Sequence, residues 1–171
     1  MAFAMVNRPR VLLIGLGDPS HGDEGIGVYL ARSLRDAFEG IEVLECPADP
    51  PPFFEILHDF DLLILIDSVR FCSTVGRVYV GTPTSLSELK GTPTCQTTAL
   101  DDAISYARLT GARIAAIRVI GVCVPDEDTT AASLSPPVAS QYDAIVARVR
   151  SSVTEILRDA GAAAAPSLSH A

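Results

Sequence analysis

Carboxylate side chains stand at two places in the chain where they could do chemistry. The glycine-rich stretch GLGDPSHGDEGIG, residues 15–27, contains Asp23 and Glu24 side by side, and Asp67 closes the apolar run DLLILID. Both stretches follow or form strands that should be neighbours in a parallel sheet, where ligands bind at the carboxyl ends of the strands. We therefore expect Glu24 and Asp67 to line one crevice, at the place where such a sheet binds its ligand.

A glycine-rich turn after a strand also predicts phosphate binding. GLGDPS begins like the G-x-G-x-x-G fingerprint, but Ser20 replaces the third glycine, and Asp23 and Glu24 at the helix start would repel pyrophosphate. The glycines leave both approaches to Glu24 without side chains, which we interpret as room for a ligand or another chain. A nucleotide-binding α/β protein remains the alternative.

The two neighbouring acids of the turn are expected to have different roles. Asp23 is predicted to cap the helix that Glu24 opens, because Asp is a favoured N-cap residue and acids suit the positive end of a helix. Glu24 is predicted to point toward the crevice.

The elements that must position these residues alternate between strand and helix. Five apolar runs, rich in Val and Ile, predict buried strands, which favours an α/β sandwich around a mostly parallel sheet. Gly111 is expected to end one helix as its C-cap. The predicted strands are residues 10–16, 41–45, 61–67, 76–81 and 113–124, and the predicted helices are 24–38, 99–111 and 136–160.

Length and composition limit the class of protein. The 171 residues predict one domain over 1–160 and a disordered, alanine-rich tail over 161–171. A net charge of −8 disfavours binding to nucleic acid or to a membrane surface. We expect a cytoplasmic monomer without a leader or a membrane span. No disulfide is expected, and each cysteine is interpreted as a small buried apolar residue: Cys46, Cys72, Cys95 and Cys123.

Four motifs resemble the family of nickel-iron hydrogenase maturation endopeptidases. They are GLGDPSHGDEGIG, the strand end and turn LIDSVRFCSTVGRV, the strand VIGVCV, and the segment LSPPV before the last helix. The resemblance covers residues 10–158 and implies a three-layer α/β/α sandwich around a five-stranded, twisted sheet. It also implies cleavage of a C-terminal extension from a hydrogenase large-subunit precursor that already carries nickel.

The resemblance implies three positions that contact the metal. Glu24 and Asp67 match the first two, while Gln96, counted back from Gly111, stands where the family has a histidine. His21 and Cys95 remain open as substitutes for that histidine. Asp18 in place of the usual Asn, and the segment ECPADPPP from Glu45, are further departures.

The group that cuts the peptide bond is not assigned. No Ser-His-Asp, Cys-His or HExxH arrangement is visible, so water or a carbonyl polarised by the metal and strain on the substrate both remain open. We expect an endopeptidase acting on the hydrogenase large-subunit precursor, with nickel carried by that substrate. A module that binds a metalloprotein precursor without cutting it is a second alternative.

Overall fold

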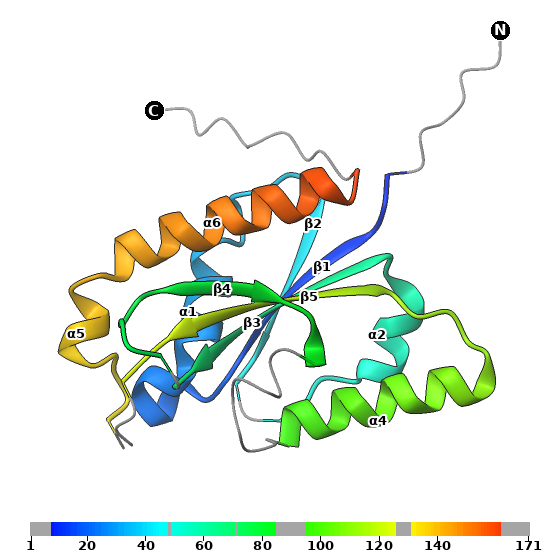
Figure 1. Ribbon diagram of the computed structural model, residues 1–171, viewed down its shortest axis with the longest axis horizontal. Helices are drawn as coiled ribbons and strands as arrows, with labels where there is room; N and C mark the ends of the chain where they lie inside the picture. Colours follow the sequence, from blue (N-terminus) through cyan, green and yellow to red (C-terminus); the bar gives the residue numbers. More distant parts are fainter. Residues whose placement is uncertain (1–7, 48, 71, 85–94, 126–130, 162–171) are drawn as a thin grey trace, which may run out of the picture.

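The fold is built on one sheet of five strands. Four of them are parallel, and the antiparallel strand β4 lies at one edge. A computed structural model describes residues 8–47, 49–70, 72–84, 95–125 and 131–161. The strand order is β2-β1-β3-β5-β4, and only β4 runs antiparallel to its neighbour (Figure 1). The sequence-based prediction of a five-stranded, mostly parallel sheet is thus confirmed. The strands are β1 (Val11–Leu16), β2 (Ile41–Cys46), β3 (Leu62–Val69), β4 (Val78–Gly81) and β5 (Ala116–Cys123).

Helices cover both faces of this sheet, which confirms the three layers. Alternate residues of the strands point to opposite faces, so the core is divided in two. One half packs α1 and α6 against Leu13 and Ile64, and the other packs α2 and α4 against Ile14 and Leu65 (Figure 1). The helical elements are η1 (Pro19–Gly25), α1 (Ile26–Ser33), α2 (Phe53–Asp59), α4 (Cys95–Thr110), α5 (Pro136–Ala139) and α6 (Tyr142–Asp159).

The predicted helices differ from the structure in several details; α1 ends at Ser33 rather than at residue 38, and α4 begins at Cys95 rather than at residue 99. Helix α2 was not predicted, because seven residues after a run of prolines carry too little periodic pattern. The last predicted helix is divided into two helices, α5 and α6. Between them the backbone of Gln141 departs from helical geometry, with φ −110° and ψ 3°. Helix α1 begins at Ile26 rather than at Glu24.

The predicted end of α4 is confirmed. Gly111 takes a positive φ of 68° after α4, the backbone geometry that a glycine C-cap supplies. Residues 162–171 lie outside the described residues, so the predicted tail remains a prediction. Within the described ranges, no helix is long and apolar enough to span a membrane.

Candidate active site

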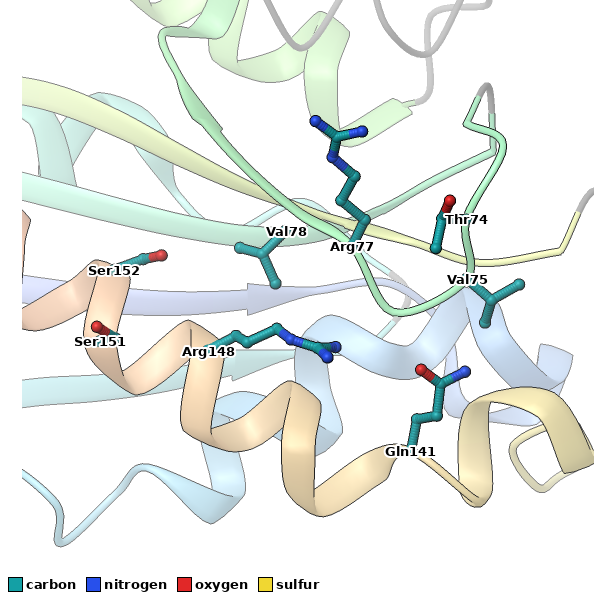
Figure 2. A pocket seen from close by; sticks show the side chains of 8 residues that line it. All are labelled: Thr74, Val75, Arg77, Val78, Gln141, Arg148, Ser151 and Ser152. Atoms are coloured by element: carbon teal, nitrogen blue, oxygen red, sulfur yellow. The ribbon is translucent and has the colours of Figure 1, made fainter.

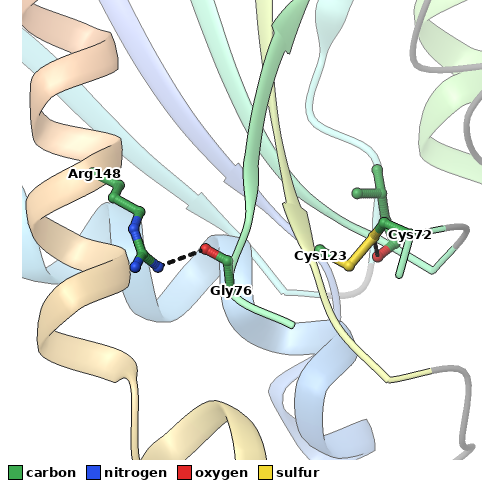
Figure 3. Close-up of a disulfide and its surroundings, with 5 residues drawn as sticks. Cys72, Gly76, Cys123 and Arg148 are labelled. Carbon is green, nitrogen blue, oxygen red and sulfur yellow. Dashed lines mark hydrogen bonds between the residues drawn. A yellow bond between two sulfur atoms is a disulfide. The ribbon is translucent and has the colours of Figure 1, made fainter. Parts of the chain in front are cut away.

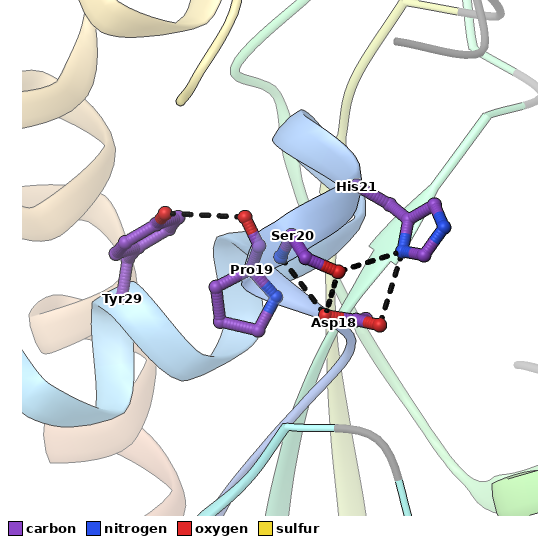
Figure 4. A network of polar contacts seen from close by, with 5 residues as sticks. All are labelled: Asp18, Pro19, Ser20, His21 and Tyr29. Atoms are coloured by element: carbon purple, nitrogen blue, oxygen red, sulfur yellow. Dashed lines mark hydrogen bonds and ion pairs between the residues drawn. The ribbon is translucent and has the colours of Figure 1, made fainter. Parts of the chain in front are cut away.

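The loop after β1 folds into the short helix η1, which lies against the end of β3. Asp18 caps η1, because its carboxylate accepts hydrogen bonds from the backbone N–H and the hydroxyl of Ser20, at 2.9 and 2.7 Å (Figure 4). These bonds, and the pairing with His21, lower the pKa of Asp18. The Asp18 noted in the sequence is therefore the residue that holds the loop in shape.

The glycines of the loop allow backbone segments of the same chain to pack closely against each other. A Cβ atom at Gly17 would overlap the carbonyl oxygen of Glu24, and one at Gly27 would overlap the carbonyl oxygens of Leu16 and Ile66. The interpretation of Gly17 and Gly27 as room for a ligand was therefore wrong. Gly27 in particular lets α1 begin directly above Ile66, the residue before Asp67.

Asp23 does not cap α1, contrary to the prediction. The N-cap position of α1 is Gly25, with no side-chain hydrogen bond, and Asp23 is only 3% exposed. Its Oδ1 instead accepts a hydrogen bond of 2.7 Å from the backbone N–H of Ser135. Asp23 therefore ties the loop after β1 to the N-cap residue of α5, Ser135, in the LSPP segment (residues 134–137).

Asp67 is buried two residues before the end of β3. It is 1% exposed, and its Oδ1 accepts a hydrogen bond of 2.7 Å from the backbone N–H of Ser68. Its backbone lies between β1 and β5 in the sheet, paired with Gly121 of β5. A carboxylate at this place is positioned by a strand in which every residue is buried.

Glu24 and Asp67 come from neighbouring parts of the fold, as their order along the sheet predicts. β1 and β3 are adjacent and parallel, and η1, which carries the half-buried Glu24, contacts β3 (Figure 1). A shared crevice for the two carboxylates stays a prediction. Gln96 and Cys95 lie in the first turn of α4, but their side chains are outside the described residues.

His21, the other candidate for the third position, has local partners. Its Nδ1 lies 3.0 Å from Asp18 Oδ2 and 3.1 Å from the Ser20 hydroxyl, and its side chain is 56% exposed (Figure 4). This arrangement leaves Nε2 as the ring nitrogen that could reach a metal. Among the described residues, no three His, Cys, Asp or Glu side chains form a group that could hold a metal by themselves.

A disulfide joins Cys72 to Cys123, contrary to the expectation from the sequence that the chain has none. The two Cα atoms are 6.0 Å apart, and the bond ties the segment after β3 to the last residue of β5 (Figure 3). Two backbone hydrogen bonds of 2.8 Å, from Gly76 N–H to Cys123 O and from Cys123 N–H to Arg77 O, hold the same region. Cys46 does fit its prediction as a buried apolar residue, and burial raises the pKa of its thiol to about 11.

A cavity of about 500 Å³ lies between α6 and the segment that leads into β4 (Figure 2). Arg148 of α6 lines it and donates a hydrogen bond of 3.0 Å to Gly76 O (Figure 3). Figure 2 shows the side chain of Arg77 turned away from Arg148. The described lining contains no carboxylate, so this cavity lacks the acidic ligands that the first loop and β3 offer.

Two features of the site were missed by reasoning from sequence. The bond between Asp23 and Ser135 joins residues 112 positions apart, and the disulfide spans 51. The disulfide had a usable signal, because Cys72 and Cys123 both stand where adjacent parallel strands end. The bond to Asp23 had none beyond the presence of both residues in the motifs of the resemblance.

Comparisons with known proteins point to one family. The model of the hydrogenase maturation protease family matches residues 28–152, a stretch that contains Asp67 and Gln96 but not Glu24. The hydrogenase expression/formation protein HupM of Azotobacter chroococcum is 23% identical over 81% of this chain and 69% of its own. HupD of Rhodobacter capsulatus is 27% identical over 81% and 68%.

Solved structures share the fold. The hydrogenase maturating endopeptidase HybD of Escherichia coli superposes with a TM-score of 0.73 at 22% identity, over 92% of this chain and 98% of its own. The hydrogenase maturation protease HycI of Thermococcus kodakarensis gives a TM-score of 0.62 at 21% identity, over 90% and 95%. With the family model matching most of its length, the chain belongs to the hydrogenase maturation protease family and is a hydrogenase maturation endopeptidase.

Proposed function

We propose that this endopeptidase removes the C-terminal extension of a nickel-iron hydrogenase large-subunit precursor after nickel has been inserted. The observation that carries the proposal is the placement of two acids at the carboxyl ends of adjacent strands in a chain of this family. Glu24 lies in η1, against the end of β3, and Asp67 lies in β3 itself. The match to the family adds the class of substrate.

Nickel enters this proposal as part of the substrate. Carboxylates and imidazoles suit nickel, and thiolates of the precursor would already hold part of its coordination sphere, so the protease needs to add only a few contacts. Glu24 and Asp67 supply two oxygen contacts in this proposal, and Gln96 supplies a weaker third. The buried position of Asp67 suits a ligand whose orientation must not change during binding.

The experiment compares one precursor in two states. The protein is incubated with purified large-subunit precursor that is either loaded with nickel or kept free of it. Intact mass spectrometry then measures the masses of the products. We expect a shortened chain only from the loaded precursor. Stable binding of the loaded precursor without any shortening would contradict the proposal and favour a non-cleaving binding module. Shortening of both forms would contradict the role of nickel.

The nucleotide-binding alternative loses its main support in this structure. That alternative depended on glycines that leave space for phosphate, whereas Gly17 and Gly27 are packed against backbone of the chain itself. The cytoplasmic location and the monomeric state stay predictions, as does the absence of nucleic-acid and membrane partners.

A further inference from the structure

The disulfide lies beside Asp67 in the sheet. Asp67 pairs with Gly121 of β5, and two residues further along the same strands Val69 pairs with Cys123. Residues two apart on a strand point to the same face of a sheet, and so do directly paired residues. Asp67 and the bridge therefore lie on one face, where Val69 and Cys72 belong to the apolar core under α2 and α4.

The bridge holds a segment that has few other ties to the sheet. Residues 72–75 lie between β3 and β4, and within this described stretch no backbone group bonds to the backbone of β5. The backbone contacts resume at Gly76, whose N–H donates to Cys123 O at 2.8 Å. The bond from Cys72 to Cys123 is thus the covalent tie between this segment and the end of β5 (Figure 3).

Asp67 is closed off in the bridged protein. It is 1% exposed, so a metal carried by another protein reaches its carboxylate only if a neighbouring part of the chain moves. One such neighbour is Val69, whose Cγ1 lies 3.0 Å from the place that a Cβ of Gly121 would take. Val69 therefore fills the space over the β5 partner of Asp67, and the bridge holds the chain that follows Val69.

We propose that Cys72 and Cys123 form a redox switch that controls access to Asp67. In the bridged state residues 72–75 stay on β5 and Asp67 stays closed. In the reduced state this segment moves away and Asp67 opens, while β3 still holds its backbone in place. The inference rests on the proposed function for its claim that the metal of the precursor must reach Asp67.

A dithiol reductant supplies the chemistry of the switch. It donates two electrons and two protons, becomes a disulfide itself, and leaves Cys72 and Cys123 as thiols. A disulfide of the substrate or of another protein reverses the step. In the cytoplasmic location expected from the sequence, disulfides usually have transient roles of this kind.

Chemical labelling of Asp67 tests its access without any cleavage. A water-soluble carbodiimide couples an amine to carboxylates that solvent reaches, and peptide mass spectrometry locates the label. The bridged protein is compared with the Cys72→Ala, Cys123→Ala double variant. We expect Asp67 to react about tenfold faster in the double variant, because local opening governs the reaction of a buried group. Asp159, which is exposed at the end of α6, should react equally in both proteins. Equal labelling of Asp67 would overturn the inference.

A second comparison changes only the redox state. The protein is oxidised or reduced, the reagent is removed by desalting, and the labelling is repeated. Reduction should speed the labelling of Asp67 in the unmodified protein and in Cys46→Ala, and should change nothing in the double variant. Cys46 is the matched control because it is a buried cysteine outside the bridge. If the double variant does not fold, the unmodified protein still decides, and labelling of Asp67 that is independent of its redox state would contradict the switch.

The loaded precursor separates this inference from the proposed function. The double variant should shorten the precursor faster than the bridged protein does. Shortening at one rate by both proteins would contradict the switch and leave the proposed cleavage standing. Faster labelling of Asp67 in the double variant, with no shortening by either protein, would support the switch and contradict the proposed cleavage.

Discussion

The backbone N–H of Ser135 donates a hydrogen bond of 2.7 Å to Oδ1 of the buried Asp23, which joins the loop after β1 to the segment before α5. Through this bond the loop that carries Glu24 is fixed to the segment at the start of α5. A change at Asp23 should therefore affect folding before it affects chemistry.

Asp23→Ala should lower the free energy of unfolding by about 1.5–3 kcal/mol, the usual contribution of a hydrogen bond to a charged group. Asp23→Asn should lose less, because its carbonyl oxygen can still accept from Ser135 N–H. Urea unfolding followed by circular dichroism measures both. Equal losses in the two variants would show that this hydrogen bond contributes little.

Gly27→Ala should destabilise the protein strongly, because the added Cβ would overlap the carbonyl oxygens of Leu16 and Ile66. The matched control is Gly40→Ala, where nothing lies within 4 Å and only the positive φ of 78° opposes the side chain. That backbone strain costs about 1–2 kcal/mol. The melting temperatures of the two variants compare them directly, and a Gly27→Ala variant at least as stable as Gly40→Ala would contradict the close packing of α1 on β3.

The Cys72–Cys123 disulfide should contribute about 2–4 kcal/mol to stability, as is typical for native bridges. Digestion without reductant should release a peptide pair joined through Cys72 and Cys123. The Cys72→Ala, Cys123→Ala double variant should unfold at a lower urea concentration than the parent. Recovery of Cys72 and Cys123 only on separate, unlinked peptides would contradict the bridge.

Glu45, at the end of β2, should make stability depend on pH. Arg32 and Arg35 of the α1 region lie 2.8 and 2.6 Å from its carboxylate, and these contacts lower the pKa of Glu45 from the ordinary 4.5. The ionised form is thus favoured in the folded state, so its contribution is complete above pH 4.5 and is lost as the pH falls through the lower, folded value.

The variant that tests this dependence is Glu45→Gln. It should be less stable than the parent at pH 7, by about 1 kcal/mol. The difference should shrink below pH 4.5. Urea midpoints measured from pH 7 to pH 3 would show it, and a difference that stays constant over this range would contradict the role of the two arginines.

The sequence predicted the sheet well because each strand can be identified from its own short apolar run. Runs such as VLLI before Gly15 are apolar enough to mark strands buried on both faces, and their alternation with helices sets the layers. The order β2-β1-β3 follows from short crossovers and placed Asp67 beside the loop of Glu24.

The contacts within the site were less accessible from sequence, because they depend on distant pairs. Asp23 has the residue type and position of an N-cap, yet tertiary structure uses it to hold Ser135 and leaves the cap of α1 to Gly25. The loop glycines have the pattern of a ligand cradle, yet backbone atoms of Glu24 and Ile66 occupy the space. Local propensity cannot distinguish these uses.

The central claim is that Glu24 and Asp67 act together on the nickel-loaded precursor. It is tested most directly by the rate of precursor shortening in Glu24→Gln, with Asp67→Asn beside it and Asp159→Asn as the exposed control. Glu24 is half-buried, so its amide variant should fold normally. We expect shortening to be abolished in Glu24→Gln and Asp67→Asn and unchanged in Asp159→Asn. Shortening at the parent rate by a folded Glu24→Gln protein would contradict the proposed role of Glu24.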